Sequence, residues 1–379
     1  MDRAPLPVIH EVIPSEVLAT IFEEHAKCEW RAPAIDQRVC RFWRQIVLNT
    51  PRAWRYLEIS HCEINHPNLR KLQSWLNRSG AVPLHIRVGI DNAFNSGDNG
   101  QAIRDLLNKH RTRIASLRMA SGSRYLFEDR EFPCLRLLDI AMLYWDSTTI
   151  HFRSFPELRS LRLSMSVQST VVRLNDLTAI ESLVLCDLTC TSLVQHSPSL
   201  TTLMLDSVSL GDTISSRVDF PSLTYLSLYN VRGLKPHINA SRLVTYHEGA
   251  DTIHESFSTP LPSLLEYGVY GPDSGDLDLT KWHILFPNIS RVAIRAVPCV
   301  LVLFLHYLSA HLRFLLVLRL ICVGHLWEDI GLTEADQKTM KYLIGVRSAA
   351  CHMDVELCFE KSPYRIPIFF GEVSHRSIK

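Results

Sequence analysis

The sequence predicts an α/β repeat protein, in which a short helical N-terminal domain precedes an irregular solenoid with a parallel sheet on its concave face. Three observations predict this architecture. The pattern L-x-x-L-x-L recurs along most of the chain, apolar residues near the N-terminus follow helical spacing, and the composition is that of a folded protein, with 46% hydrophobic and 21% charged residues. A chain of 379 residues is too long to fold around one compact core, so we expect two domains or an elongated array.

Two apolar stripes predict helices between residues 11 and 60. Pro14 suits the first turn of a helix, where its missing N–H would have no partner anyway. After it, Val17, Leu18, Ile21 and Phe22 recur at helical spacing. A second stripe, which Asn49-Thr50-Pro51 would end, comprises Ile35, Val39, Phe42, Trp43, Ile46 and Val47. These stripes are either the core of an ordinary small helical domain or a surface that docks on a partner.

The same residues resemble the F-box, a short three-helix domain that attaches proteins to a cullin–RING ubiquitin ligase. The resemblance runs from Ile13 to Trp54, and Ile13 stands where the family usually has leucine, a swap that keeps volume and polarity. It implies binding to a Skp-type adaptor, and through the adaptor to a cullin scaffold. The residues that this resemblance assigns to adaptor binding are Ile13, Pro14, Val17, Leu18, Ile21, Phe22, Ile35, Val39, Cys40, Trp43 and Trp54.

The second half of this segment is locally basic. Residues 37–57 contain no acidic side chain and five arginines, namely Arg38, Arg41, Arg44, Arg52 and Arg55. This stretch is either a solvated basic helix face or a surface complementary to an acidic partner. The resemblance implies such a partner, since the adaptor of this family is acidic. The net charge of the whole chain is only +1, so we do not expect a nucleic-acid partner.

A repeat occupies residues 114–330. Its first apolar positions recur every 20 to 25 residues, at Ile114, Leu135, Leu158, Ile180, Leu200, Leu223, Leu243, Leu264 and Ile289. The pattern and the period are those of leucine-rich repeats, whose units can bury their apolar faces only against their neighbours. The asparagine or cysteine that usually follows each strand is missing, and Ser166, Leu143, Leu188, Val208, Val231 and Val297 stand there instead. Aliphatic side chains cannot satisfy backbone groups as an asparagine ladder does, so we expect irregular convex segments.

The remaining segments connect and close these parts. Residues 1–10 form a tail, and residues 61–113 a packed connection with a helix at 67–80, a strand through Leu84, Ile86 and Val88, a loop at 91–100 and a helix carrying Ile103, Leu106 and Leu107. This arrangement resembles the F-box proteins of mushroom-forming fungi. Residues 331–379 lose the repeat, and we interpret them as a C-terminal cap with one strand through Met353, Val355, Leu357 and Phe359.

The repeat register also predicts a surface. The leucines of each strand point inward, and the residues between them face the concave side. Tyrosine and arginine often anchor protein interfaces, although any solvated row of strands also needs polar outer positions. The candidate client-binding residues are Arg162, Asp206, Tyr225, Tyr229, His247, Glu266, Tyr270, Arg291, Arg295 and Arg319. Among them the tyrosines would be anchors, and the Arg291, Arg295 and Arg319 end would favour an acidic epitope.

No chemistry of its own is indicated. The chain has no phosphate-binding, nucleotide, zinc-protease or nucleophile-elbow motif, and its ten cysteines and seventeen histidines form no ligand-like spacing, so we expect no enzyme activity, cofactor or metal. Residues 1–12 lack the apolar core of a signal peptide, which favours a cytoplasmic or nuclear location with reduced thiols. Residues 296–312 are uncharged, but Pro298, His306 and His311 interrupt them, which favours a buried helix and strand over a membrane span.

The resemblance therefore implies a non-catalytic substrate receptor of an SCF-type ubiquitin ligase. Such a receptor acts by position, because it raises the effective concentration of a client protein near the ubiquitin-loaded enzyme. Two alternatives stay open: a leucine-rich-repeat scaffold that binds the adaptor without directing ubiquitination, and a soluble enzyme with an unrecognised site. The client itself is not indicated by the sequence.

Overall fold

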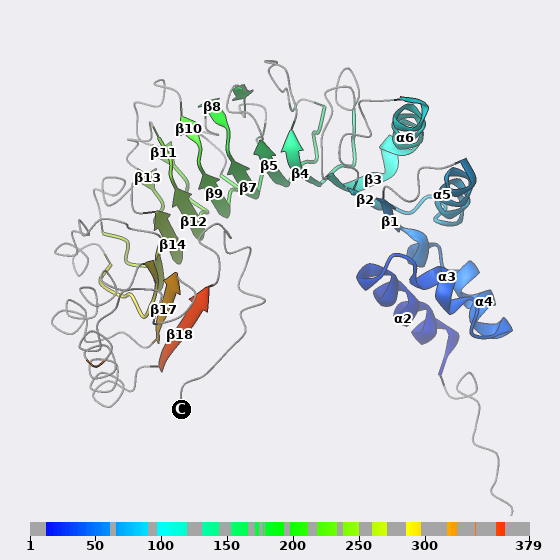
Figure 1. Cartoon of the computed structure of the whole chain (residues 1–379), viewed down its shortest axis with the longest axis horizontal. Coiled ribbons are helices and arrows are strands. Elements are labelled where there is room, and N and C mark those ends of the chain that lie inside the picture. Colours follow the sequence, from blue (N-terminus) through cyan, green and yellow to red (C-terminus); the bar gives the residue numbers. More distant parts are fainter. Residues whose placement is uncertain are drawn as a thin grey trace, which may run out of the picture. The chain divides into compact units, whose positions relative to one another are not determined.

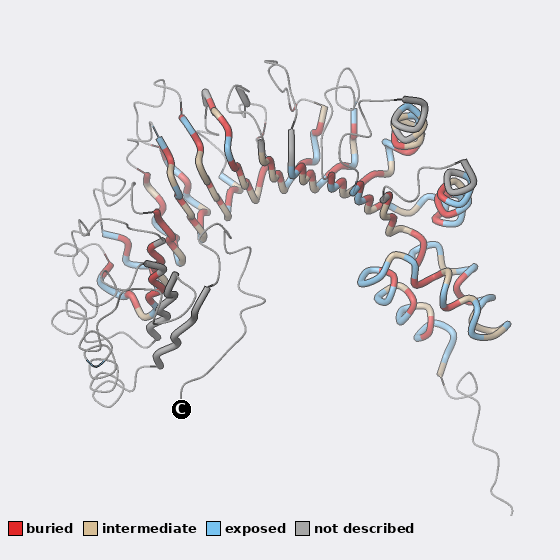
Figure 2. Tube along the Cα trace, in the orientation of Figure 1, coloured by how far each residue is buried: buried red, intermediate tan, exposed pale blue. Residues whose placement is uncertain are grey.

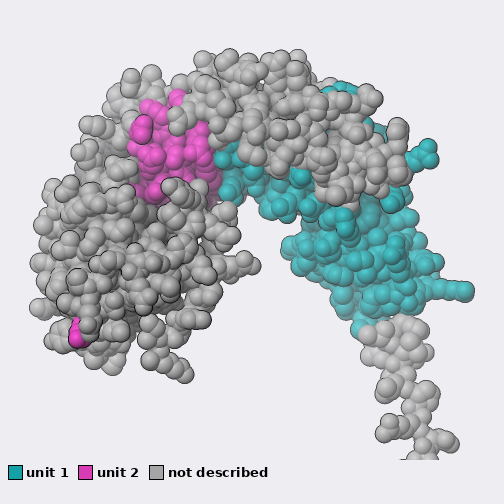
Figure 3. Space-filling model, viewed as in Figure 1, with its two compact units in different colours: residues 1–167 teal, residues 168–379 magenta. Residues whose placement is uncertain are grey.

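The structure is a computed structural model, and its description covers part of the chain. The described residues are 13–60, 66–89, 97–119, 131–143, 152, 154–165, 171–173, 177, 179–192, 198–210, 218–232, 238–249, 260–270, 286–296, 317–323, 338 and 354–360. They belong to two compact units, residues 1–167 (unit 1) and 168–379 (unit 2), which Figure 3 colours separately. None of the helices in these ranges has the length and apolar character needed to cross a membrane.

Unit 1 begins with a small group of helices: α2 (Ser15–Cys28), α3 (Ala32–Asp36), α4 (Arg41–Leu48) and the 3-10 helix η1 (Pro51–Trp54) (Figure 1). Pro14 occupies the N-cap position of α2, one residue before the first turn in which the sequence placed it. The second apolar stripe is divided between α3 and α4, whereas the sequence suggested one continuous helix. Cys40 causes the division, because its backbone is extended and its Sγ accepts the N–H of Trp43, which caps α4.

These helices enclose a core of their own. Leu18, Phe22 and Trp54 are at most 2% exposed, and the indole Nε1 of Trp54 donates to the Val47 carbonyl over 2.8 Å. The ring of Trp43 packs edge-on against Phe22, with 5.0 Å between the centroids. Part of the apolar surface in this segment is therefore satisfied internally, as expected of an ordinary helical domain.

A parallel sheet follows in unit 1 and starts earlier than the sequence suggested. Its strands, in spatial order, are β1 (Tyr56–Ser60), β2 (Leu84–Gly89), β3 (Ile114–Met119), β4 (Leu137–Leu143) and β5 (Ser160–Met165). Each neighbouring pair is parallel, so the stacking begins with β1 rather than at residue 114. The first two crossovers are full helices, α5 (His66–Arg78) and α6 (Gly97–His110), and their longer spacing hid these units from a 20–25-residue periodicity.

The segment between the N-terminal helices and residue 114 packs against those helices, and its strands belong to the sheet itself. The ring of Trp75 on α5 lies 4.6 Å from Trp54 and 5.3 Å from Trp30, centroid to centroid, which joins α5 to the preceding helices. Arg113 donates to the Ser79 hydroxyl and the Val82 carbonyl just after α5 ends. The loop expected at 91–100 cannot extend to residue 100, because α6 begins at Gly97; residues 90–96 lie outside the described ranges.

Unit 2 is a parallel-strand β-solenoid. Its main sheet has the spatial order β7 (Ser182–Cys186), β9 (Thr202–Asp206), β12 (Tyr225–Tyr229), β14 (Thr245–Gly249), β15 (Glu266–Tyr270), β16 (Arg291–Ala296), β17 (Val317–Val323) and β18 (Asp354–Glu360) (Figure 1). The repeat positions align across it: Leu183, Leu203, Leu226, Tyr246, Tyr267 and Val292 are successive register partners.

The predicted repeat register is confirmed. All nine first apolar positions, from Ile114 to Ile289, are at most 4% exposed. Along a strand, buried residues alternate with more exposed ones, as in β9 and β12 (Figure 2). The strand expected in the C-terminal segment is β18, which pairs in parallel with β17 and so extends the sheet.

The segments after the strands carry short strands in place of an asparagine ladder. Leu188, Val208 and Val231 are buried at the anomalous position. Around them β6 (Val171–Arg173), β8 (Thr189–Ser192) and β10 (Ser209–Leu210) form a second sheet in the order β10-β8-β6, and β11 (Val218–Asp219) pairs with β13 (Ile238–Asn239). Backbone pairing thus satisfies the polar groups that the aliphatic side chains cannot. Residues 166 and 297 lie outside the described ranges.

Candidate functional site

Unit 1 exposes apolar side chains on α2, on α3 and in the turn that follows α3. Val17 and Ile21 are each 48% exposed, Ile35 is 53% exposed and Val39 is 60% exposed. Val17 and Ile21 are four residues apart and share one face of α2. Four large exposed aliphatic side chains so close together in the chain make this segment a candidate docking surface. We call these four residues the aliphatic patch.

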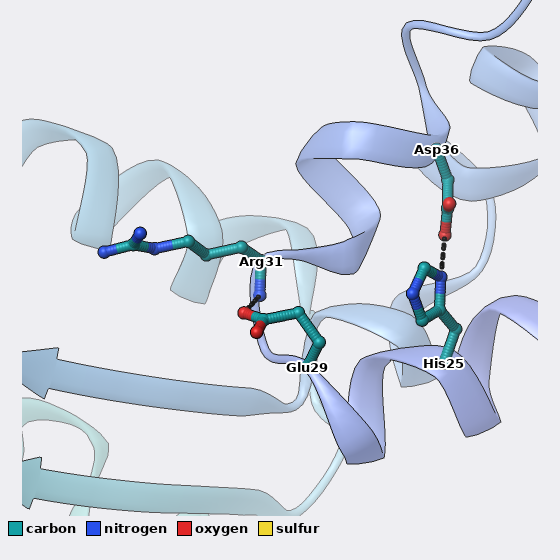
Figure 4. Close-up of polar contacts among 4 residues, drawn as sticks. All are labelled: His25, Glu29, Arg31 and Asp36. Carbon is teal, nitrogen blue, oxygen red and sulfur yellow. Dashed lines mark hydrogen bonds and ion pairs between the residues drawn. The ribbon is translucent and has the colours of Figure 1, made fainter.

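A polar contact links the two helices of the aliphatic patch. His25 continues the Val17–Ile21 row of α2, and its Nδ1 lies 3.2 Å from Oδ2 of the buried Asp36 at the end of α3 (Figure 4). Burial raises the pKa of Asp36, and the nearby His25 partly offsets that rise. The Glu29 carboxylate accepts the backbone N–H of Arg31 over 3.1 Å in the connecting turn (Figure 4). These contacts fix where Ile35 and Val39 emerge relative to α2.

The other residues that the F-box resemblance assigned to adaptor binding have different environments. Leu18, Phe22 and Trp54 are buried in the helical core and position the helices, so they offer no surface in this structure. Ile13, Cys40 and Trp43 are half-buried, and Pro14 is exposed.

The arginine-rich stretch is only partly available to a partner. Arg55 is bound by Glu23, with 2.7 Å between Nη2 and Oε1, and the Nε of Arg44 donates to the Gln37 carbonyl. Arg38, Arg41 and Arg52 are exposed. The acidic partner of Arg55 belongs to α2. It therefore lies outside residues 37–57, the range that contains no acidic side chain.

Unit 2 has a face whose side chains alternate with the buried repeat positions. We call the residues of β9, β12, β14 and β15 at these alternate positions the open face. On β12 it comprises Tyr225, Ser227 and Tyr229, between the inward Leu226 and Leu228. These positions are the ones that the repeat register predicted to point away from the core.

His247 is the exception on the open face. It was predicted to contact a client, but it is only 2% exposed. Its ring lies over Gly268, where an added Cβ would come within 2.6 Å of the imidazole, and it sits between Tyr225 and Glu266. The Tyr225 hydroxyl is 3.1 Å from Nδ1, and Glu266 Oε1 is 3.6 Å from Nε2. His247 therefore holds these two neighbours in place, and their edges remain half-exposed.

The remaining predicted client-binding residues are distributed over both units. Tyr229 is 38% exposed and lies over Gly249, and Arg291 on β16 is exposed. Arg162 belongs to unit 1, where its Nε is 3.9 Å from Asp139. For Tyr270, Arg295 and Arg319 the structure gives the strand register, and their side chains lie outside what it describes.

One core group was missed by the sequence reasoning. Glu248 is 1% exposed at a position where the two preceding strands have Leu228 and Leu205. Its carboxylate accepts the hydroxyl of Tyr246 over 2.6 Å and that of Tyr267. Aligning the repeats would have revealed a carboxylate at a leucine position, together with tyrosines in the neighbouring column.

The described part of the chain contains no cluster of three or more side chains suited to a metal ion. No protein-family model matches the sequence, and no curated protein or solved structure proves similar to it. The function of the protein is therefore inferred from the aliphatic patch, the open face and the residues of the chain itself.

Proposed function

We propose that this protein is the substrate-recognition subunit of an SCF-type cullin–RING ubiquitin ligase. In this proposal the N-terminal helices form an F-box that binds a Skp-type adaptor, and the solenoid binds a client protein. The observation that carries it is the aliphatic patch, which exposes Val17, Ile21, Ile35 and Val39 within the very segment that resembles the F-box.

The burial pattern of α2 favours a docking surface over a purely internal core for the apolar stripes. A helical domain that used both stripes for its own core would bury them, but this domain buries Leu18 and Phe22 while exposing Val17 and Ile21. Covering exposed aliphatic surface yields about 25 cal/mol per Å² before the costs of association, so an apolar partner surface would stabilise the complex. The exposed Arg38 and Arg41 beside the patch suit a partner with an acidic rim.

The test is co-purification of the full chain with a Skp-type adaptor and a cullin. Wild type should capture both, and Ile21→Asp or Val39→Asp should lose both, because a charge would be buried against apolar surface. Leu265→Asp is the matched control, since Leu265 is an aliphatic residue of unit 2 with 46% exposure. Adaptor capture that is unchanged by Ile21→Asp and Val39→Asp would contradict the proposal.

A scaffold that binds the adaptor without directing ubiquitination is the second candidate, because the same aliphatic patch supports it equally. The two candidates differ in whether the cullin is captured together with the adaptor. Capture of adaptor and cullin together, with accumulation of a bound protein after proteasome inhibition, supports the ligase. Capture of adaptor alone supports the scaffold.

A further inference from the structure

Two arginines lie side by side on the sheet of unit 1. Arg87 on β2 and Arg118 on β3 are register partners, so their backbones are about 5 Å apart on neighbouring parallel strands. Both positions alternate with buried residues, and both side chains are exposed. We call these two residues the arginine pair. The repeat register read from the sequence begins at residue 114, so it did not place Arg87 on this surface.

The arginine pair is not neutralised within the part of the chain that the structure describes. There, neither guanidinium takes part in an ion pair, whereas Arg55 of the same unit is bound by Glu23. Like charges directly opposite each other on neighbouring strands are destabilising. A negatively charged group from a partner would relieve this repulsion, so the pair offers positive charge for binding.

The positive charge of this surface acts on a neighbouring histidine. His85 precedes Arg87 by two residues on β2, so it faces the same side of the sheet, and its ring stacks on Tyr56 with 5.0 Å between centroids. Burial lowers the pKa of His85, and the charges of Arg55 and Arg118 lower it further. Both charge effects have the direction expected of a locally positive surface.

The sheet surface next to Arg87 has free space. Gly89 follows Arg87 by two residues on β2, so it also faces the same side of the sheet. It is exposed, and a Cβ added to it would meet no atom within 4 Å. A partner side chain therefore has room beside the guanidinium of Arg87.

The row of residues that contains the arginine pair favours a single carboxylate over a polyanion. Glu58 on β1 is the register partner of Arg87, and Asp139 on β4 is that of Arg118. Acidic residues thus flank the pair on both sides, and they would repel the successive phosphates of a nucleic acid. Arginine matches the geometry of a carboxylate, to which it donates two parallel hydrogen bonds. Two adjacent arginines between two acids therefore suit one acidic side chain.

We propose that the arginine pair binds the carboxylate of one glutamate or aspartate residue in a segment of the client protein. The two guanidinium groups donate hydrogen bonds to its oxygens, and the client segment occupies the free space at Gly89. This inference rests on the proposed client-binding role of the solenoid. It adds a client contact in unit 1, whereas the client-binding residues predicted from the sequence lie mainly in unit 2.

The test uses immobilised full-length protein and four pools of degenerate peptides, each with one fixed central residue: glutamate, glutamine, lysine or phosphoserine. Wild type should retain the glutamate pool over the glutamine and lysine pools. Arg87→Ala and Arg118→Ala should each reduce that retention about tenfold, the size expected for loss of a charge-assisted hydrogen bond. Arg70→Ala is the matched control and should not, because Arg70 is an exposed arginine of α5, outside the sheet.

A second variant keeps both arginines. Gly89→Glu places a carboxylate of the chain itself in the free space beside Arg87, where it would compete with the client. It should reduce retention of the glutamate pool at least as strongly as Arg87→Ala. Gly89→Gln, which has nearly the same size without the charge, should reduce it less.

Equal retention of the glutamate and glutamine pools, or a glutamate preference that survives both arginine variants, would overturn the inference. Retention of the phosphoserine pool alone, or stronger retention of a mixed-sequence RNA oligonucleotide, would overturn the assignment to a carboxylate. Thermal unfolding checks the fold of each variant, and both arginine variants should unfold at or above the wild-type temperature, because each removes repulsion within the pair.

Adaptor capture is measured in the same samples, so the two proposals fail separately. Loss of adaptor binding with a preserved glutamate preference would remove the ligase proposal alone. Intact adaptor binding without any preference among the pools would remove the carboxylate site alone.

Discussion

The aliphatic patch of unit 1 and the open face of unit 2 are both candidate interfaces, but they are built differently. The patch consists of aliphatic side chains of α2, α3 and the turn after α3, whereas Leu18 and Phe22 of α2 are buried in the helical core. The open face consists of rings and carboxylates that hydrogen bonds and glycines hold in place. An aliphatic surface suits one constant apolar partner, whereas ordered polar groups can discriminate among segments of different charge.

The largest expected effect tests whether core and patch are separate in unit 1. Trp54→Ala removes a fully buried ring and should destabilise the helical domain by about 3–5 kcal/mol. Ile21→Ala, at a 48% exposed position, should change stability by about 0.5 kcal/mol or less. Chemical denaturation of both variants measures the difference. Equal destabilisation would mean that Ile21 belongs to the core.

The second prediction concerns the buried carboxylate of unit 2. Glu248→Leu restores the aliphatic residue of the neighbouring strands but leaves the hydroxyls of Tyr246 and Tyr267 without this acceptor. We expect a loss of about 1–3 kcal/mol for each hydroxyl, measured by denaturant unfolding. Adding Tyr246→Phe and Tyr267→Phe should recover most of it. No recovery in the triple variant would show that the carboxylate has another role.

The third prediction tests whether glycine shapes the open face. Gly268→Ala places a Cβ within 2.6 Å of the His247 ring and should cost about 1–3 kcal/mol, because the imidazole must move away from Tyr225 and Glu266. Gly89→Ala is the matched control, since no atom lies within 4 Å of the Cβ it would add. Thermal unfolding compares the two. An equal shift in both variants would contradict a specific contact with His247.

The smallest expected effect is a pH dependence. Burial and the charge of Asp187 raise the pKa of Asp206, so ionisation of Asp206 is less favourable in the folded state than in the unfolded chain. The contribution of Asp206 to wild-type stability should therefore fall as pH rises from the ordinary aspartate value of 3.8 through the raised value. Asp206→Asn should unfold at a higher temperature than wild type at neutral pH, and the two should converge below about pH 3.8. A constant difference at every pH would contradict this.

The sequence predicted the parallel-strand solenoid because the repeated apolar positions are the ones that become buried. Its nine first apolar positions, from Ile114 to Ile289, are all buried, and the leucines of the strands that follow pair in register, as Leu203 and Leu226 do. It did not predict that stacking begins at β1, because α5 and α6 lengthen the first crossovers beyond the repeat period. It also placed Ile35 and Val39 on the same helix as Val47, because periodicity alone does not reveal the cap that Cys40 supplies to α4.

The candidate sites were harder to predict from sequence. Strand alternation correctly placed Tyr225 and Tyr229 outward, but it could not show that His247 would be covered. That outcome depends on Gly268 on the next strand, which lets the ring lie flat. On α2, periodicity found the apolar positions without dividing them between core and patch, because that division depends on how α2 packs against α3 and α4.

The most direct test of the proposed function is calorimetric titration of the purified full chain with a purified Skp-type adaptor. We predict a one-to-one complex with a negative heat-capacity change, because aliphatic surface is buried. Val39→Asp should abolish binding, and Leu265→Asp should leave it unchanged. Absence of binding by the wild-type chain, or equal binding by Val39→Asp, would contradict the assignment of the aliphatic patch to an adaptor.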